Sequence, residues 1–327
     1  MADRLRLSAV FSDYGVTRGL RNGSAPVDGV ELEIVEVEPV IAAYRRMIRD
    51  LEFDVCELAP TTYLMAREAG IPITALPIFV MRKFHHSDLV GRADANIEKP
   101  VDLEGRRVGV RAYSVTSGVW VRSIVATDHG VDLDSITWVI DDEDHVSSYQ
   151  NPANVERLPK GTSIAEEFAR GGISAALTGP AGVGRSGSPT GGWKAADVSA
   201  ADPVGVFHSP ADEAADWHRR TGVYPIHGVL TVRDDVLRDN PWVAQALTDA
   251  FVRSRDEYVA TLDDSINDSA DDRRYRELRS VVGDQPLPYG TAANAVSLEA
   301  LVGAAHDQGL IQQRPQIEDL FADVDAR

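Results

Sequence analysis

Apolar, strand-like segments alternate with helical patterns along most of this 327-residue chain. An apolar segment spans residues 5–11, a helical pattern follows Pro39 as far as Asp50, and another apolar segment spans residues 53–58. Such alternation is typical of βαβ units, in which helices pack on a largely parallel sheet. It therefore predicts an α/β protein.

The alternation starts again after residue 100, and the chain length suits two α/β domains. We expect the chain to cross to a second lobe near residues 86–90 and to return near residue 225. The predicted division is lobe 1 from residues 1–86 plus 226–327 and lobe 2 from residues 87–225, with a ligand cleft between them. The further strands are expected at residues 73–80, 108–110, 136–140, 175–177 and 224–232. The further helices are expected after Pro60 with Thr61 or Thr62 as the candidate N-cap, at 117–129, from Ser163 with its capping-box partner Glu166, at 211–220, from Pro241-Trp242 and at 296–308.

Composition narrows the range of partners. The net charge of −18 argues against nucleic acid and against anionic membranes, because both attract basic surfaces. A local cluster of arginine and histidine can still bind a small anion.

The single cysteine, Cys56, lies in an apolar segment and predicts a buried thiol without an intrachain disulfide. The first residues lack the pattern of a signal peptide, and no segment has the roughly 18 apolar residues of a membrane span, so we expect a cytoplasmic protein.

The segment from Arg82 to Ser87 is the richest in reactive side chains. It follows an apolar strand at the expected crossover, where ligands bind in open α/β sheets. Arg82 could clamp a carboxylate with two hydrogen bonds, and His85 or His86 could donate a proton near neutral pH. A solvated basic turn is the alternative explanation of this segment.

A second candidate segment joins a predicted strand to a helix. Tyr113, Thr116 and Ser117 stand at the helix start, where hydroxyls and free N–H groups can bind an anion, although plain helix capping explains them equally well. Trp120 and Arg122 follow on the first turns. Trp120 could stack on a planar ligand, but a core tryptophan is the commoner outcome.

Two other patterns carry less chemistry. Residues 182–187 match G-x-G-x-x-G, but the Ser-Pro-Thr-Gly-Gly that follows cannot open the helix that a phosphate site needs, so residues 179–192 are predicted to form a loop. His227 enters the returning strand and could face the cleft or serve the structure. No spacing of His227 with His85, His86, Asp13 or Glu57 is typical of metal ligands, so no metal is predicted.

Several motifs resemble the 4,5-dihydroxyphthalate decarboxylase-like family of the type 2 periplasmic-binding-protein superfamily. The similarity runs from Leu5 to the end of the helix at 242–262. The Arg82-x-Phe84-x-His86-Ser87 and Thr116-x-x-x-Trp120-x-Arg122 motifs are fairly specific. The other shared blocks are Glu57 with Thr61, Thr62 and Tyr63; Asp102-Leu103-x-Gly105-x-x-Val108-Gly109-Val110; Trp138; Thr221-Gly222 followed by Pro225-Ile226; and Pro241-Trp242.

This resemblance implies a two-lobe fold and a carboxy-lyase of aromatic acid catabolism. The implied reaction is the cofactor-independent decarboxylation of a hydroxylated aromatic acid. The implied catalytic residues are His86, His227 and Arg82. The residues implied to bind substrate are Arg82, His85, Ser87, Glu57, Thr61, Thr62, Tyr113, Thr116, Ser117, Trp120 and Arg122.

One position departs from the family pattern. The family's histidine follows Pro-Ile by two positions, where this chain has Gly228, and His227 comes one residue earlier. Neighbouring side chains of a regular strand point to opposite faces, so His227 reaches the cleft only if a bulge turns it. The alternative function is therefore a non-catalytic binding protein for a small aromatic or carboxylate ligand, either transporter-like or an intracellular sensor. Assembly into a homo-oligomer is compatible with either function.

Overall fold

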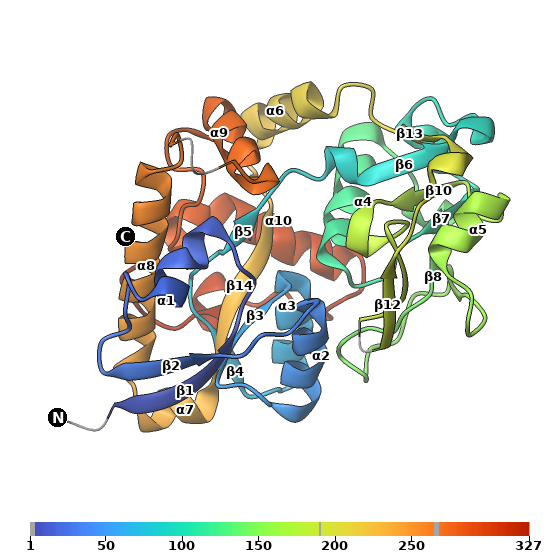
Figure 1. Cartoon of the computed structure of the whole chain (residues 1–327). Helices are drawn as coiled ribbons and strands as arrows, with labels where there is room; N and C mark the ends of the chain where they lie inside the picture. The colour runs from blue at the N-terminus through green and yellow to red at the C-terminus, as the bar shows by residue number, and fades with distance from the viewer. Residues whose placement is uncertain (1–3, 190, 265–267, 327) are drawn as a thin grey trace. The chain divides into compact units, whose positions relative to one another are not determined.

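The computed structural model describes residues 4–189, 191–264 and 268–326. The chain divides into two compact units, each with its own sheet (Figure 1). Unit 1 comprises Met1–Lys83, Gly222–Val302 and Gln313–Arg327, and unit 2 comprises Phe84–Thr221 and Gly303–Gln312.

Unit 1 is built on a six-stranded sheet with the order β2-β1-β3-β14-β4, and β5 pairs with β14 outside this path. β1 runs parallel to β2 and β3, whereas β14 runs antiparallel to β3, β4 and β5. The strands are β1 (Leu5–Val10), β2 (Val30–Ile34), β3 (Val55–Leu58), β4 (Ile73–Ala75), β5 (Met81–Arg82) and β14 (Ile226–Arg233). The helices are η1 (Gly15–Thr17), α1 (Arg18–Asn22), α2 (Ile41–Asp50), α3 (Pro60–Glu68), α7 (Asp234–Asp239), α8 (Val243–Ala260), α9 (Ala270–Val282), α10 (Thr291–Asp307, whose last residues belong to unit 2) and η8 (Ile317–Leu320).

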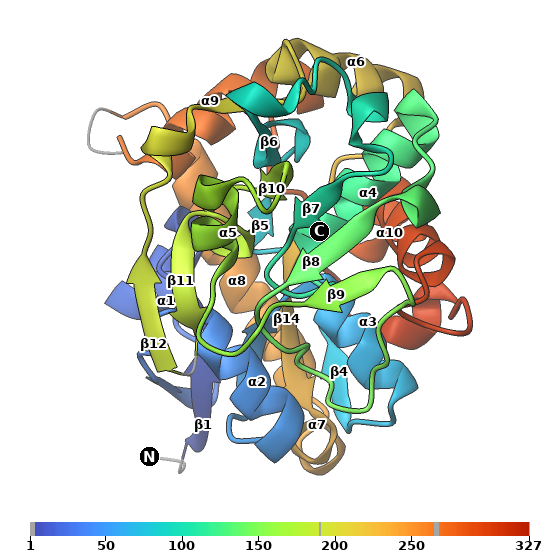
Figure 2. The ribbon, with the colours of Figure 1, turned by 90° about the vertical axis from the view of Figure 1, so that its right-hand side faces the viewer.

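Unit 2 has a second six-stranded sheet, with the order β13-β6-β10-β7-β8-β9, and a two-stranded hairpin of β11 and β12 (Figure 2). The strands are β6 (Leu89–Arg92), β7 (Arg107–Gly109), β8 (Thr137–Ile140), β9 (Val155–Arg157), β10 (Ala175–Leu177), β11 (Arg185–Ser188), β12 (Gly191–Ala195) and β13 (Pro203–Gly205). The helices are η2 (His86–Asp88), η3 (Ala93–Ala95), η4 (Pro100–Leu103), α4 (Thr116–His129), η5 (Leu133–Ser135), α5 (Ile164–Arg170), η6 (Gly179–Ala181), η7 (Ser199–Ala201) and α6 (Pro210–Thr221).

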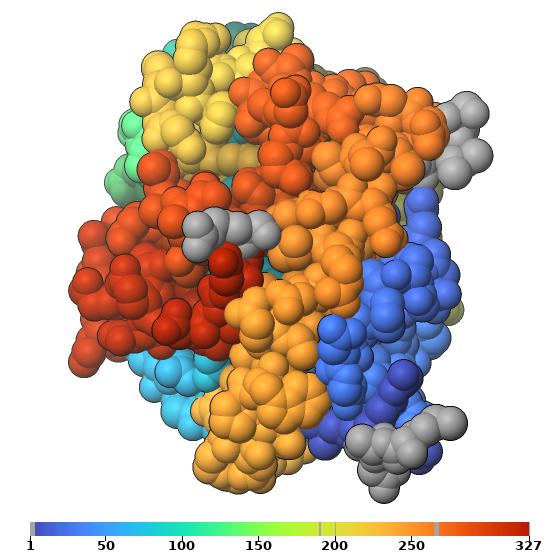
Figure 3. All heavy atoms as spheres, turned by 90° about the vertical axis from the view of Figure 1, so that its left-hand side faces the viewer, coloured from blue at the N-terminus to red at the C-terminus, as the bar shows by residue number. Residues whose placement is uncertain are grey.

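Each unit has its own hydrophobic core. In unit 1 the sheet side chains Ala9, Val55 and Leu230 pack with Leu247 and Phe251 of α8. The surface of α8, orange in Figure 3, lies beside the blue residues that begin the chain, in agreement with the packing of α8 on α1 and η1. The core of unit 2 joins strands β8 and β10 to α5. Burying strands and one face of each helix in this way is the general basis of an α/β fold.

Helix termini confirm one local prediction and correct another. α5 begins with the predicted capping box. The Ser163 side chain accepts from the N–H of Glu166, and the Glu166 carboxylate accepts from the N–H of Ser163. The N-cap of α3, in contrast, is Ala59, and Pro60 occupies the first turn. Thr61 and Thr62 therefore lie inside the first turn, and the prediction that one of them is the N-cap is wrong.

Three features differ from the sequence-based expectation. The glycine-rich stretch predicted as a loop contains the β11–β12 hairpin, and α9 was not predicted. Residues 303–312 group with unit 2, because Gln308 accepts from Arg122 Nε at 2.6 Å and donates to the Val119 carbonyl at 3.0 Å, both in α4. Cys56 is buried, as predicted. Among the described residues, none of the helices is both long and apolar enough to cross a membrane.

Candidate functional site

In unit 1, a buried carboxylate lies at the end of β3. Glu57 is 1% exposed, and its Oε1 accepts from the Tyr14 hydroxyl at 2.9 Å and the Tyr44 hydroxyl at 3.0 Å. Its Oε2 accepts from the Ser12 N–H at 2.9 Å. Burial raises the pKa of Glu57, and these hydrogen bonds oppose the shift. Sequence reasoning found Glu57 but missed Tyr14 and Tyr44, which reach it from separate segments.

β14 passes close to this carboxylate at Gly228. A Cβ on Gly228 would lie 3.1 Å from Glu57 Oε1 and 3.0 Å from Val80 Cγ2, closer than ordinary contact. The position that holds histidine in the family pattern is Gly228 here, and Glu57 occupies the space next to it. Next to it, the β5–β14 register shifts between Ile226 and Gly228, which makes His227 the extra residue of a bulge. A bulge is the irregularity that allows His227 to leave the regular alternation of the strand.

Arg82 lies on β5, opposite Ile226, and is 1% exposed. Its guanidinium donates to Asn294 Oδ1, to the Tyr224 carbonyl and, at 3.3 Å, to Ser297 Oγ. The guanidinium also stacks on the Tyr224 ring, 4.2 Å from its centroid, and burial lowers the pKa of Arg82 to about 10. Within the described part of the chain, the ionisable neighbours that act on the Arg82 guanidinium are the tyrosines Tyr224 and Tyr275 rather than a carboxylate. The carboxylate-clamp role stays a prediction, and the contacts show that Arg82 already holds β14 and α10 together.

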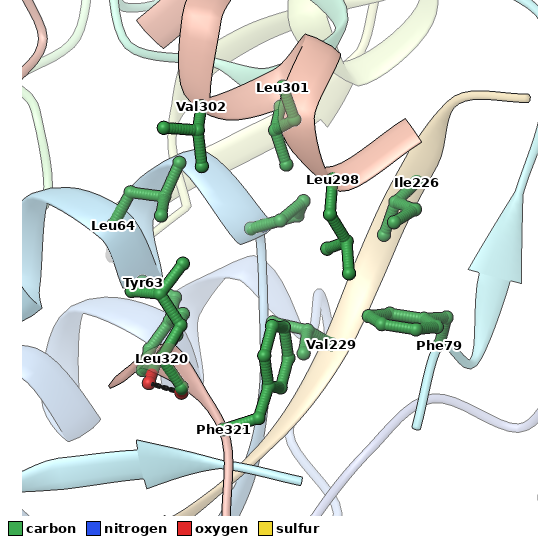
Figure 4. A pocket seen from close by; sticks show the side chains of 11 residues that line it. Tyr63, Leu64, Phe79, Ile226, Val229, Leu298, Leu301, Val302, Leu320 and Phe321 are labelled. Carbon is green, nitrogen blue, oxygen red and sulfur yellow. Dashed lines mark hydrogen bonds between the residues drawn. The ribbon is translucent and has the colours of Figure 1, made fainter. Parts of the chain in front are cut away.

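The first turn of α3 places Thr61 and Thr62 in buried positions, 0% and 3% exposed. Ala59 caps this helix without a side-chain hydrogen bond, so the first N–H groups depend on other partners. Beyond Pro60, an apolar cavity of about 10 Å³ lies between α3, β14 and α10 (Figure 4). It is large enough for about one water molecule. It is lined by Pro60, Tyr63, Leu64, Phe79, Ile226, Val229, Leu298, Leu301, Val302, Leu320 and Phe321.

In unit 2, the Arg-x-Phe-x-His-Ser motif continues into the short helix η2. His85 is fully buried and its Nδ1 lies 2.8 Å from Asp88 Oδ2. A carboxylate at this distance orients the ring and favours the tautomer with the proton on Nδ1. Ser87, in contrast, is exposed. The motif therefore places its two histidines inside the unit and its serine at the surface.

His86 is 2% exposed and packs among aromatic rings. Its ring centroid lies 5.2 Å from that of Phe207, 5.6 Å from that of Trp217 and 6.5 Å from that of Phe84. Its Nδ1 has no hydrogen-bond partner among the described residues. Burial, followed by the nearby His85, lowers the pKa of His86 to about 4, so its ring is neutral at pH 7.

This lowered pKa predicts a pH dependence of stability. An unfolded chain binds the proton of a histidine below about pH 6.5, whereas folded His86 binds it only near pH 4. The free energy of unfolding should therefore have its full value above pH 6.5. It should decrease by on the order of 3 kcal/mol as the pH falls towards 4. In urea titrations across this range, His86→Gln should flatten the slope and the exposed His208→Gln should leave it unchanged. Equal slopes in all three proteins would contradict the prediction.

The second predicted segment starts α4, and its side chains are buried: Tyr113, Thr116, Ser117, Trp120 and Arg122 are 4% exposed or less. Arg122 donates to Gln308 and, at 2.6 Å, to the Tyr113 carbonyl. Its guanidinium also lies 3.9 Å from the Tyr113 ring centroid. Arg122 thus fixes the residues that precede α4. The roles of this segment in substrate binding stay predictions.

Two buried ion pairs beside these elements escaped sequence reasoning. Arg111 pairs with Asp142 at 3.1 Å, and Arg185 of β11 pairs with Asp141. Asp141 also accepts from the Ile164 N–H at the start of α5, at 3.0 Å. The adjacent Asp141-Asp142 after a predicted strand was the available signal. Within residues 4–189, 191–264 and 268–326, no group of three or more His, Cys, Asp or Glu side chains could hold a metal ion.

The fold is shared with solved structures of low sequence identity. The alkanesulfonate-binding protein SsuA from Xanthomonas axonopodis pv. citri, bound to MOPS, matches with a TM-score of 0.54 and 12% identity over 98% of each chain. The desulfurization enzyme DSZB matches with a TM-score of 0.53 and 16% identity over 98% of this chain and 96% of that chain. The protein therefore has the two-lobe α/β fold of periplasmic-binding-like proteins, as predicted.

Sequence relatives define the family. A family model described as NMT1/THI5 like matches residues 27–154. The chain is 30% identical over 336 residues to a 4,5-dihydroxyphthalate decarboxylase of Comamonas testosteroni, covering 97% of this chain and 96% of the relative. It is 29% identical over 227 residues to a protein of the same name from Pseudomonas putida, covering 66% of this chain and 83% of the relative. The chain belongs to the 4,5-dihydroxyphthalate decarboxylase-like family of the type 2 periplasmic-binding-protein superfamily.

Proposed function

We propose that the protein catalyses the cofactor-independent decarboxylation of a hydroxylated aromatic carboxylic acid. The similarity to named 4,5-dihydroxyphthalate decarboxylases over 97% of the chain is the observation that carries this proposal. The similarity covers both units, so it includes every residue group described above. The net charge of −18 disfavours nucleic acid and anionic membranes as partners, and a small acid would bind through a local cluster of donors.

The proposed reaction needs one proton and releases one carbon dioxide. A ring hydroxyl pushes electrons to the carbon that bears the carboxylate, and that carbon takes a proton. The bond from the ring to the carboxylate then breaks, its electron pair restores the aromatic ring, and neutral carbon dioxide leaves. The protein must therefore supply a proton donor, orient the carboxylate and hold the ring hydroxyl.

Unit 1 carries residues suited to these tasks. His227, on the bulge of β14, is our choice of proton donor, because the pKa of His86 is about 4 and His85 is engaged with Asp88. The buried first turn of α3, with Thr61 and Thr62, would orient the carboxylate through hydroxyls and N–H groups. Arg82 would act as a positioning residue that holds β14 in place through Tyr224.

Release of carbon dioxide tests the proposal directly. The protein is incubated with 4,5-dihydroxyphthalate, phthalate and a set of mono- and dihydroxybenzoates, and carbon dioxide and the aromatic product are followed together. We expect turnover only for acids with a ring hydroxyl, since phthalate lacks the electron release. Replacing His227 by asparagine should lower kcat by about 100-fold or more, the usual contribution of a general acid.

The same set of acids separates an enzyme from a binding protein. If several acids raise the melting temperature but none is decarboxylated, the enzyme proposal is wrong and the chain is a ligand-binding protein. Full activity of His227→Asn would instead remove His227 from the reaction and leave the decarboxylase proposal in place.

A further inference from the structure

The apolar cavity of about 10 Å³ in unit 1 is bordered by the chain segments that carry the proposed reaction (Figure 4). Pro60 lines the cavity and precedes Thr61, which would orient the carboxylate from the first turn of α3. Ile226 also lines it and precedes His227, our choice of proton donor. The cavity therefore adjoins both segments that would act on the substrate.

The bulge of β14 builds one wall of this cavity. β5 pairs with Ile226 and with Gly228, so His227 is an extra residue between them. In a regular strand, the side chains at 226 and 229 would face opposite sides of the sheet. The extra residue brings Ile226 and Val229 to the same side, and both line the cavity. The irregularity that sets His227 apart thus also shapes the space next to it.

The cavity offers no polar group to a water molecule. Among the described residues that line it, Tyr63 alone has a polar group in its side chain. The Tyr63 hydroxyl donates to the Leu320 carbonyl and accepts from the Ala75 N–H at 3.1 Å, and the surface exposed to the cavity is apolar. A buried water needs about two to four polar partners, and apolar cavities without them stay dry and take up apolar molecules. The occupant that fits is a small molecule that makes no hydrogen bonds.

Carbon dioxide has the properties that this cavity selects. It is neutral, has no dipole moment, and is a linear molecule only slightly wider than water. The cavity is not fully closed, which leaves room for the length of a linear molecule and a path in and out. The aromatic acid and the aromatic product of the proposed reaction are both too large for a space of about 10 Å³.

We infer that this cavity binds the carbon dioxide that leaves the aromatic ring. The inference rests on the proposed decarboxylation and adds a separate site for its smaller product. Carbon dioxide that remains beside the ring carbon can add back to it, because the reaction is reversible until the gas has left. Uptake by the cavity moves a neutral molecule away from the ring, so no bond forms and no proton or charge moves in this step.

Val302 of α10 permits a variant that fills the cavity. Val302 lines the cavity and is 2% exposed, so the extra methylene of Val302→Ile occupies the free space. Val243 of α8 is the matched control, because it is equally buried in a helix of unit 1 but belongs to the hydrophobic core and does not line the cavity. Val243→Ile should lower the melting temperature by overpacking, whereas Val302→Ile should keep or raise it.

Infrared spectroscopy detects bound carbon dioxide without turnover. The stretching band of ¹³C-labelled carbon dioxide is recorded in buffer and in concentrated protein solution at rising gas pressure. We expect the wild-type protein and Val243→Ile to show a second, narrower band that saturates with pressure, because a fixed apolar site is a more uniform environment than water. Val302→Ile should lose most of this second band.

Each outcome decides one of the two proposals. Absence of the second band in the wild type, an equal band in Val302→Ile and wild type, or an equal loss in Val302→Ile and Val243→Ile would each overturn the inference about the cavity. If the band depends on Val302 but no hydroxylated acid is decarboxylated, the carbon dioxide site stands and the proposed function fails. If acids are decarboxylated and the wild type shows no second band, the function stands and this inference fails.

Discussion

Replacing Arg82 by methionine should destabilise the protein by about 3–4 kcal/mol, because the loss leaves buried acceptors without donors. The guanidinium donates to Asn294 Oδ1, the Tyr224 carbonyl and Ser297 Oγ, all inside unit 1. Methionine retains most of the apolar stem and so isolates the polar loss. Denaturation by urea, followed by circular dichroism, measures the difference.

The exposed Arg6 on β1 is the matched control. Its side chain is 80% exposed and pairs with Glu31, so Arg6→Met should cost less than about 1 kcal/mol. The sequence alone predicted Arg82 as a carboxylate clamp, and its buried contacts within unit 1 add a structural role that the sequence did not reveal. A loss of stability no larger than that of Arg6→Met, together with lost affinity for acids, would return Arg82 to the role of a ligand clamp.

Local patterns predicted much of the fold because they depend on near neighbours in the chain. The alternation of strands and helices, the capping box at Ser163 and the buried Cys56 are all properties of short segments. α9 was missed because few of its residues are buried, so its apolar pattern is weak. Periodicity predicts helices that bury a face, and this helix buries little more than Asp272 and Tyr275.

The candidate site depends on contacts that no spacing reveals. Tyr14 and Tyr44 approach Glu57 from positions 43 and 13 residues away. A Cβ at Gly228 would crowd Glu57 and Val80, and the bulge at His227 depends on the pairing with β5. A histidine one position early in the sequence was a visible departure from the family pattern. Its physical reason became visible only when β14 was placed beside Glu57.

The glycine-rich stretch illustrates the same limit in unit 2. Residues 179–192 have the composition of a loop, yet Arg185 anchors the start of the β11–β12 hairpin to Asp141, which is 44 residues earlier in the chain. Both side chains are 2% exposed. A long-range ion pair of this kind orders a segment whose own residues favour no regular structure.

Asp141→Asn should therefore be strongly destabilising, by about 3–5 kcal/mol, because it leaves Arg185 as a buried charge without its partner. The amide also weakens the bond that Asp141 accepts from Ile164 at the start of α5. Glu156→Gln is the matched control. The Arg107–Glu156 pair joins β7 to β9 in unit 2, and both side chains are roughly two-fifths exposed. This pair should therefore contribute less than about 1 kcal/mol.

A double-mutant cycle separates the ion pair from the carboxylate's other contact. Arg185→Met combined with Asp141→Asn removes the unpaired charge, so the double variant should be more stable than Asp141→Asn alone. Amide hydrogen exchange should show the β11–β12 hairpin opening first in Asp141→Asn and less in the double variant, because the charge no longer draws water into the unit. Additive losses of stability in the cycle would mean that Arg185 and Asp141 act independently, and that the hairpin is held by its own backbone hydrogen bonds.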